Sequence, residues 1–304
     1  MAAFQLFLVT LGKTTPILLA CMGGMISELA GVINFALEAM MLTGAFLAVW
    51  LAFVSGSPWL GLMGGALGGM LIGLMHSLAC LKFRTNQIVS SIALNLLAAG
   101  ATGVLLNQIF GVYGTSPSVA KLPTLRQCIS ESLPFVDNGP AWTSGEISIL
   151  APLAIALSLL TMAFFRWSVW GLRIKACGEN PLAAKAAGLP VTLMRSLVVL
   201  TGGALAGMGG AYLSIGELSA FVEHMTQGRG YLAIAALILG RWKPLGILLA
   251  ALLFGFSEAF SEWLAVSWAN LPHQFFLALP YLVCLAVLTL QIGKTRPPSS
   301  LGRL

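Results

Sequence analysis

Long apolar runs, separated by short polar or glycine- and proline-containing stretches, dominate this chain. Runs long enough to cross a hydrocarbon core of about 30 Å recur along it. They predict membrane-spanning helices at residues 14–32, 36–54, 59–80, 86–109, 146–165, 195–214, 229–240, 244–268 and 274–291. The seventh run is too short to cross fully, which favours a broken or re-entrant helix. The stretch 30–34 either separates two spans or kinks one helix, so we expect an all-α, polytopic integral membrane bundle of about 8–10 spans.

Composition agrees with a protein that is largely buried in lipid. The 304 residues are 58% hydrophobic and only 9% charged, whereas soluble domains carry about 25% charged residues. We therefore expect a single transmembrane domain over residues 1–304. The first residues lack the basic region and the cleavage site of a signal peptide, so none is expected.

Basic residues predict the orientation. If the loop at about 166–195 is cytoplasmic and the spans alternate, 12 of the 16 Lys and Arg residues fall on the cytoplasmic side. That bias follows the positive-inside rule. It predicts a cytoplasmic C-terminus, an external N-terminus if nine spans hold, and an external loop at about 110–145. The net charge of +6 is then explained by topology and requires no nucleic acid.

Small residues indicate how two of the spans pack. The third span repeats glycine every four residues at Gly61, Gly65, Gly69 and Gly73, and the sixth span carries Gly203 and Gly207. Such faces allow a neighbouring helix to approach closely.

A weak internal repeat is also suggested. The segments GAFLAVWLAFVSGSP (44–58) and GYLAIAALILGRWKP (230–244) share their Gly-to-Pro spacing, and their helices are predicted to run in opposite directions. An inverted-topology repeat of a transporter requires that relation.

The stretch GENPLAAKAAG (178–188) predicts a short helix with both ends specified. Asn180 suits the N-cap, Pro181 the first helical position and Gly188 the left-handed residue after the last turn. Pro190 prevents continuation. At about two turns, this helix is too short to be stable alone, so it requires a partner or a tertiary support.

Catalytic motifs are missing from the sequence. The three histidines are far apart, the five cysteines form no CxxC pair, and the two Gly-Lys-Thr fragments lack the earlier glycine of a phosphate-binding loop. We therefore expect no enzyme activity, no metal and no cofactor in this chain.

Polar residues at membrane depth are the candidates for a substrate path. Asn34 and Glu38 lie one turn apart at the start of the second span, and Asn95 lies in the fourth. Glu258 and Glu262 form a similar pair near the end of the eighth span. Each set could line a path, but Asn34, Glu38 and Asn95 could instead bond helices together, and Glu258 and Glu262 could simply mark an exposed interfacial end.

Six segments carry a resemblance to a known family. They are SELAGVINFALEAMMLTGAF (27–46), GSPWLG (56–61), NQIVSSIALNLLA (86–98), GENPLAAKAAGLP (178–190), GGALAGMGGAYLS (202–214) and GRGYLAIAALILGRWKP (228–244). With them the chain resembles the permease subunit of a type II ABC importer, in the branched-chain amino acid and simple-sugar permease superfamily. Within that group it is most similar to the subset for nucleosides or simple sugars.

The resemblance implies the function and the partners. It implies a permease in the bacterial cytoplasmic (inner) membrane that moves a nucleoside or simple sugar. The implied partners are separate ABC ATPase subunits that hydrolyse ATP, a second permease subunit in a homo- or heterodimer, and an external substrate-binding protein or lipoprotein. It also implies that 178–190 is the helix that docks onto the ATPase, through Gly178, Glu179, Asn180, Pro181, Ala184, Lys185, Ala187 and Gly188.

Two other classes remain open from the residues alone. An ion-coupled secondary transporter of a small polar solute would use Glu38 or another buried carboxylate and would need no ATPase. A membrane-embedded enzyme is disfavoured by the missing nucleophile, metal and cofactor motifs.

Overall fold

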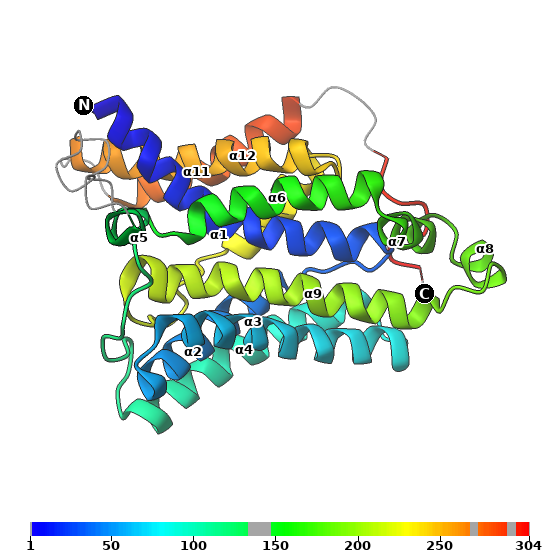
Figure 1. Ribbon diagram of the computed structural model, residues 1–304, viewed down its shortest axis with the longest axis horizontal. Helices are drawn as coiled ribbons and strands as arrows, with labels where there is room; N and C mark the ends of the chain where they lie inside the picture. Colours follow the sequence, from blue (N-terminus) through cyan, green and yellow to red (C-terminus); the bar gives the residue numbers. More distant parts are fainter. Residues whose placement is uncertain (1, 133–146, 268–272, 291–295, 304) are drawn as a thin grey trace.

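The protein is an elongated bundle of helices lying side by side, shown by a computed structural model that describes residues 2–132, 147–267, 273–290 and 296–303 (Figure 1). Most of its helices run roughly along the long axis. The helices are α1 (Ala2–Leu29), α2 (Leu37–Ser55), α3 (Pro58–Ser77), η1 (Leu78–Lys82), α4 (Gln87–Phe110), α5 (Leu125–Ser132), α6 (Leu150–Trp167), α7 (Val169–Glu179), α8 (Pro181–Ala186), α9 (Val191–Ala211), η4 (Tyr212–Leu218), α10 (Arg229–Leu239), α11 (Pro244–Ser267) and α12 (His273–Leu290). We name the two ends of the bundle after the short helices that they carry, the α5 end and the α8 end.

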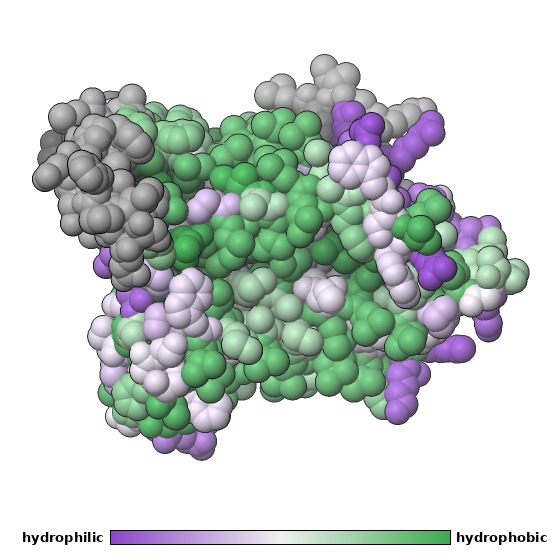
Figure 2. All heavy atoms as spheres, in the orientation of Figure 1, coloured by the Kyte–Doolittle hydropathy of each residue, from purple (hydrophilic) through white to green (hydrophobic). Residues whose placement is uncertain are grey.

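The predicted membrane character is confirmed by helix length and composition. Seven of the described helical segments are long and apolar enough to cross a membrane. They are Phe4–Leu29, Leu37–Ser55, Pro58–Lys82, Gln87–Phe110, Leu150–Trp167, Val191–Leu218 and Pro244–Val266. The helix α10, which corresponds to the seventh apolar run, is shorter than these, as we expected. The segment Gln274–Val287 of α12 is a second short apolar helix. Figure 2 shows a broad hydrophobic band between the two ends, with hydrophilic side chains gathered at the α8 end.

The first predicted span was wrong at its N-terminal boundary. We placed it at residue 14, but α1 begins at Ala2 and continues through Lys13. Lys13 stays in the helix because its Nζ lies 2.6 Å from Glu217 Oε1 and 2.7 Å from Glu262 Oε1. Because carboxylates of other helices pair with its charge, Lys13 can lie within the span and does not end it. The two alternatives for residues 30–34 are settled by the break between α1 and α2, which separates two helices.

The core forms where α9 packs against α1, α2 and α3. The glycine faces predicted for the third and sixth spans meet there. A Cβ added at Gly44 would lie 2.5 Å from both Cα and O of Gly207, and one added at Gly69 would collide with the carbonyl of Gly203. Backbone therefore touches backbone along these helices, and only glycine leaves the necessary room.

The helices α2 and α10 run in opposite directions from a common region. The last turns of α2 and α4 meet through the edge-to-face rings of Phe53 and Phe110, 5.2 Å apart. After the end of α10, by contrast, Trp242 Nε1 donates to Glu28 Oε2 at 2.7 Å, and Glu28 lies in the last turn of α1. An inverted repeat requires its two helices to run in opposite directions, as α2 and α10 do. The repeat itself stays a prediction.

The predicted external loop lies partly within the described residues. Residues 112–124 lie along η4 and the segment that follows it, through Leu122 N to Ile215 O (2.8 Å), Val119 N to Ser219 O (2.8 Å) and Ser116 N to Phe221 O (2.9 Å). The loop also contains α5. Pro134 and Pro140, which belong to the same predicted loop, lie outside the described residues.

Candidate functional site

The first turns of α2 and α10 are joined by one carboxylate. Glu38, in the first turn of α2, accepts hydrogen bonds from Gly228 N through Oε1 (2.9 Å) and from Gly230 N through Oε2 (2.8 Å). The first amides of a helix have no partner inside it and attract negative charge. Glu38 therefore caps the start of α10 from a neighbouring helix, an arrangement that its position in the sequence could not reveal.

Asn95 of α4 holds the same region from the other side. Its Oδ1 accepts from Ala39 N (3.0 Å), and its Nδ2 donates to Phe35 O (3.1 Å) and to Tyr231 Oη (2.9 Å). One amide thus connects the start of α2, the first turn of α10 and α4. The sequence analysis singled out Glu38 and Asn95 separately, and the structure brings them together.

A pocket of about 310 Å³ lies beside this junction, and we call it the central pocket. Its lining comes from α2, α4, α10 and the segment that precedes α10: Glu38, Ala39, Leu42, Asn95, Leu96, Ala99, His224, Thr226, Gln227, Gly228 and Tyr231. The volume is at the lower end of the range for small-molecule sites.

The segment before α10 has an unusual backbone. Ser219, His224 and Gln227 all have positive φ, at 61°, 56° and 45°. Residues other than glycine seldom adopt this conformation, and where they do so together the surrounding structure must hold them. The sequence analysis gave Gln227 no role, because neither residue type nor spacing signals a strained backbone.

Asn34 lies away from the central pocket, fully buried behind the start of α2. Its Nδ2 is 3.4 Å from Ser27 Oγ and 3.6 Å from Met40 Sδ, and its Oδ1 has no partner among the described residues. Nearby, His76 of α3 contacts Ile33 O through Nε2 (3.0 Å) and Ser90 Oγ through Nδ1 (3.1 Å). Asn34 and His76 thus position the break between α1 and α2.

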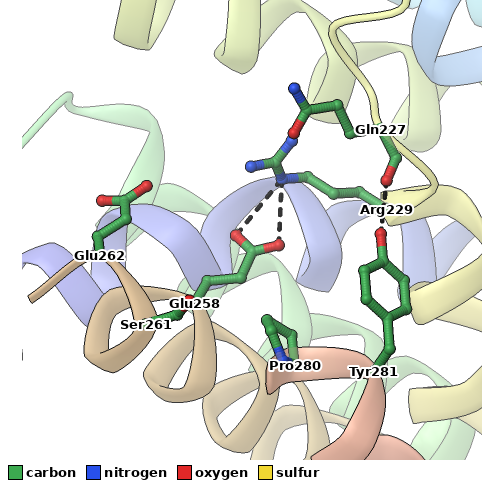
Figure 3. A pocket seen from close by; sticks show the side chains of 7 residues that line it. All are labelled: Gln227, Arg229, Glu258, Ser261, Glu262, Pro280 and Tyr281. Carbon is green, nitrogen blue, oxygen red and sulfur yellow. Dashed lines mark hydrogen bonds and ion pairs between the residues drawn. The ribbon is translucent and has the colours of Figure 1, made fainter. Parts of the chain in front are cut away.

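A second pocket, of about 300 Å³, lies toward the α5 end and is drawn in Figure 3; we call it the outer pocket. Its lining is Gln227, Arg229, Glu258, Ser261, Glu262, Pro280 and Tyr281. Arg229 Nε lies 3.3 Å from Glu258 Oε1, and both side chains are largely buried (14% and 12% exposed). Tyr281 Oη donates to Gln227 O at 2.6 Å. Sequence reasoning treated Glu258 and Glu262 alike, but only Glu258 is buried against a cation, whereas the Glu262 side chain is 54% exposed.

The short helix α8 has the ends that the sequence specified. The Oδ1 of Asn180 accepts from Ala183 N at 3.0 Å, and Pro181 is the first residue of the helix. Gly188 has φ of +80°, with Gly188 N bonded to Lys185 O (3.0 Å) and Leu189 N to Ala184 O (3.1 Å). This pair of bonds is the Schellman motif. A helix of six residues is therefore fixed at both ends.

Most of α8 faces away from the chain. Leu182 is 80% exposed, and Lys185 and Ala187 are exposed as well. Ala184, however, is buried within the chain. Figure 1 shows α8 projecting beyond the ends of the long helices.

The base of α8 is anchored to the rest of the protein. Glu179 Oε2 accepts from Ser299 Oγ at 2.6 Å, and a Cβ added at Gly178 would collide with the carbonyl of Leu29. Burial raises the pKa of the Cys177 thiol, against a smaller opposite effect of the Arg195 charge. Gly178 and Glu179 thus hold α8 in place from within the chain.

Apart from Asn34, the predicted site residues fall into two groups at a distance along the bundle. Glu38 and Asn95 line the central pocket, while residues 178–188 form and support α8 at the α8 end. Across the described parts of the chain, no group of three His, Cys, Asp or Glu side chains could hold a metal ion.

Comparison with known proteins identifies a permease family. The family described as the permease component of the branched-chain amino acid transport system matches residues 6–288. The guanosine ABC transporter permease protein NupQ of Bacillus subtilis is 33% identical over 96% of this chain and 93% of its own length. The nucleoside ABC transporter permease protein NupC of Lactococcus lactis is 33% identical over 95% and 92%. A putative glucose ABC transporter permease protein, TsgC13 of Haloferax volcanii, is 35% identical over 82% and 74%.

Proposed function

The chain belongs to the permease family of branched-chain amino acid transport systems, and from that premise we propose that it moves a nucleoside or simple sugar as the membrane subunit of an ATP-driven importer. Similarity to a guanosine permease and to a nucleoside permease over nearly the whole chain carries the proposal. The single domain would lie in a bacterial cytoplasmic membrane, with α8 and the C-terminus on the cytoplasmic side. The excess of Lys and Arg predicted for that side supports this orientation.

In this proposal, α8 docks onto an ABC ATPase. Both ends of α8 are fixed by hydrogen bonds, and its outer face is exposed at Leu182 and Lys185. A helix with a defined shape loses little conformational freedom when it binds. Because the base of α8 is anchored to the rest of the chain, a movement of the ATPase would displace α1 and α9 together with α8.

The central pocket is the proposed substrate path. It lies where α2 and α10 begin, so a change in the relation of these helices would alter the pocket directly. The apolar face of α4 beside it is exposed at Ile92, Leu96 and Leu97. In this proposal a second permease subunit packs against this face, and an external binding protein delivers the ligand at the α5 end.

Reconstitution tests the proposal directly. The chain would be purified with its ATPase, its second permease and its binding protein and placed in proteoliposomes with radiolabelled guanosine, D-ribose or D-glucose. We expect uptake of at least one probe that requires ATP and persists when ionophores collapse ion gradients. Uptake by this chain alone, driven by a proton or sodium gradient, would instead establish the secondary-transporter alternative.

A further inference from the structure

We propose that the side-chain amide of Gln227 contacts the transported ligand between the outer and central pockets and selects a nucleoside over a simple sugar. This inference rests on the proposed function and names the substrate class and one specificity-determining residue. Gln227 lines both pockets. A ligand that passes from one pocket to the other therefore meets this residue.

The backbone of Gln227 is held at two points. Its N donates to His224 O at 3.0 Å, and its carbonyl accepts from Tyr281 Oη at 2.6 Å. The next residue, Gly228, is in turn bonded to Glu38. A φ of +45° at a glutamine is costly, and these bonds maintain it.

The side chain of Gln227, by contrast, is free. It is exposed, and no described residue forms a hydrogen bond with its amide. Figure 3 shows the side chain extending away from the carbonyl that Tyr281 holds. A fixed backbone with a free amide in a pocket is suited to binding a ligand, because the amide gains bonds without a large loss of backbone freedom.

Glu38 and Asn95, the two sequence candidates that line the central pocket, are already engaged by other groups of the chain. Both carboxylate oxygens of Glu38 accept backbone bonds, and Asn95 makes three of the four hydrogen bonds open to an amide. Glu38 and Asn95 are therefore positioning residues. Gln227 is the amide left to meet a ligand.

The two pockets differ in a way that suits the two halves of a nucleoside. On the central side, Leu42, Leu96 and Tyr231 provide apolar and aromatic surface for a flat base. On the outer side, the Glu262 side chain is 54% exposed and provides carboxylate oxygen for sugar hydroxyls. A glutamine amide can donate and accept at once, which matches the edge of a purine. A simple sugar can bond the amide through its hydroxyls, but it has no flat base to place on the apolar central side.

The test compares two probes in the reconstituted complex. Initial rates of guanosine and D-ribose uptake would be measured for the wild type, for Gln227→Met, which keeps length but loses both hydrogen-bonding groups, and for Gln227→Glu, which loses the donor. The matched control is Gln108→Met, at an exposed glutamine of α4 that lines neither pocket.

We expect Gln227→Met to lower the ratio of guanosine uptake to D-ribose uptake by about tenfold, which corresponds to about 1.4 kcal/mol. Where guanosine is measured as an inhibitor of D-ribose uptake, its inhibition should weaken by the same factor. Gln227→Glu should lower it as well, and Gln108→Met should leave it unchanged. Where the wild type takes up only guanosine, the same tenfold change is expected in the KM for guanosine at unchanged ATPase activity.

Two outcomes would overturn the inference. If the wild type transports guanosine and the Gln227 variants slow both probes equally or change nothing, Gln227 does not select the ligand, while the proposed function stands. If the wild-type complex transports neither probe nor D-glucose, the proposed function fails first and the inference with it. Circular dichroism and yield of each variant would establish that it is folded.

Discussion

Arg195 Nη2 donates a hydrogen bond to Ser300 Oγ at 3.2 Å, across 105 residues of sequence. The same guanidinium donates to the carbonyls of Ala30 (2.9 Å), Cys177 (3.1 Å) and Arg303 (3.2 Å). One side chain, only 4% exposed, therefore connects the end of α1, the end of α7, the start of α9 and the segment 296–303. These elements form the base on which α8 stands.

Arg195→Met should destabilise the protein by about 2–4 kcal/mol, because several buried carbonyl oxygens would lose their donor. Arg195→Lys should recover only part of the loss, since an ammonium cannot present the planar fork of donors. Thermal unfolding in detergent measures the effect. Arg166→Lys, at an exposed arginine of α6, is the control and should be neutral; equal stability of Arg195→Met would contradict this account.

Gly44→Ala should be among the most disruptive single-methyl changes in the chain. The new Cβ would lie 2.5 Å from Cα and O of Gly207, so α2 and α9 would have to separate. We expect a loss of several kcal/mol, beyond the cost of ordinary overpacking. Expression level and thermal unfolding provide the measurement.

Gly100→Ala is the matched comparison for Gly44→Ala. Gly100 lies in α4 with no atom within 4 Å of the added Cβ, and alanine favours a helix over glycine. This variant should be neutral or slightly stabilising. A similar loss in both variants would mean that helix propensity or membrane insertion, and not helix contact, determines the outcome.

The helices and the two close-packed glycine faces could be predicted from the sequence, because apolar length and four-residue spacing are local properties. The caps of α8 could be predicted for the same reason, since Asn180, Pro181 and Gly188 act within one short segment. The position of Lys13 inside α1 could not, because its partners Glu217 and Glu262 are more than 200 residues away.

The site divides in the same way. Polarity in an apolar segment was enough to find Glu38 and Asn95. Their partners, the first amides of α10 and the start of α2, became visible only in three dimensions. Gln227 went unnoticed because an exposed glutamine in a connection has no distinctive local signal, and its importance arises from the two pockets that share it.

Asn180→Ala should weaken coupling to the ATPase without changing the membrane bundle. Loss of the bond to Ala183 N removes the N-cap of α8, which costs about 1 kcal/mol. In the reconstituted complex we expect less ATPase assembly with this subunit and slower transport, at unchanged thermal stability of the isolated permease.

Asn180→Ser provides the control, because serine is also a good N-cap and should retain most of the activity. Gly188→Ala tests the other end of α8, where φ of +80° disfavours a side chain. If Asn180→Ala and Gly188→Ala both assembled and transported normally, the shape of α8 would not matter for docking.

Glu38→Ala should release the start of α10. The amides of Gly228 and Gly230 would lose the carboxylate that caps them, so both should exchange with solvent deuterium faster. Hydrogen exchange followed by mass spectrometry on peptides that cover residues 225–232 measures this locally, and peptides from α3 serve as the internal reference. Glu38→Gln retains an oxygen for only one of the two amides and should give an intermediate rate.

Gly230→Ala should also accelerate exchange, although it leaves Glu38 in place, because its Cβ would lie 2.5 Å from Glu38 N and push the two helices apart. Unchanged exchange in both Glu38→Ala and Gly230→Ala would show that α10 is held by other contacts.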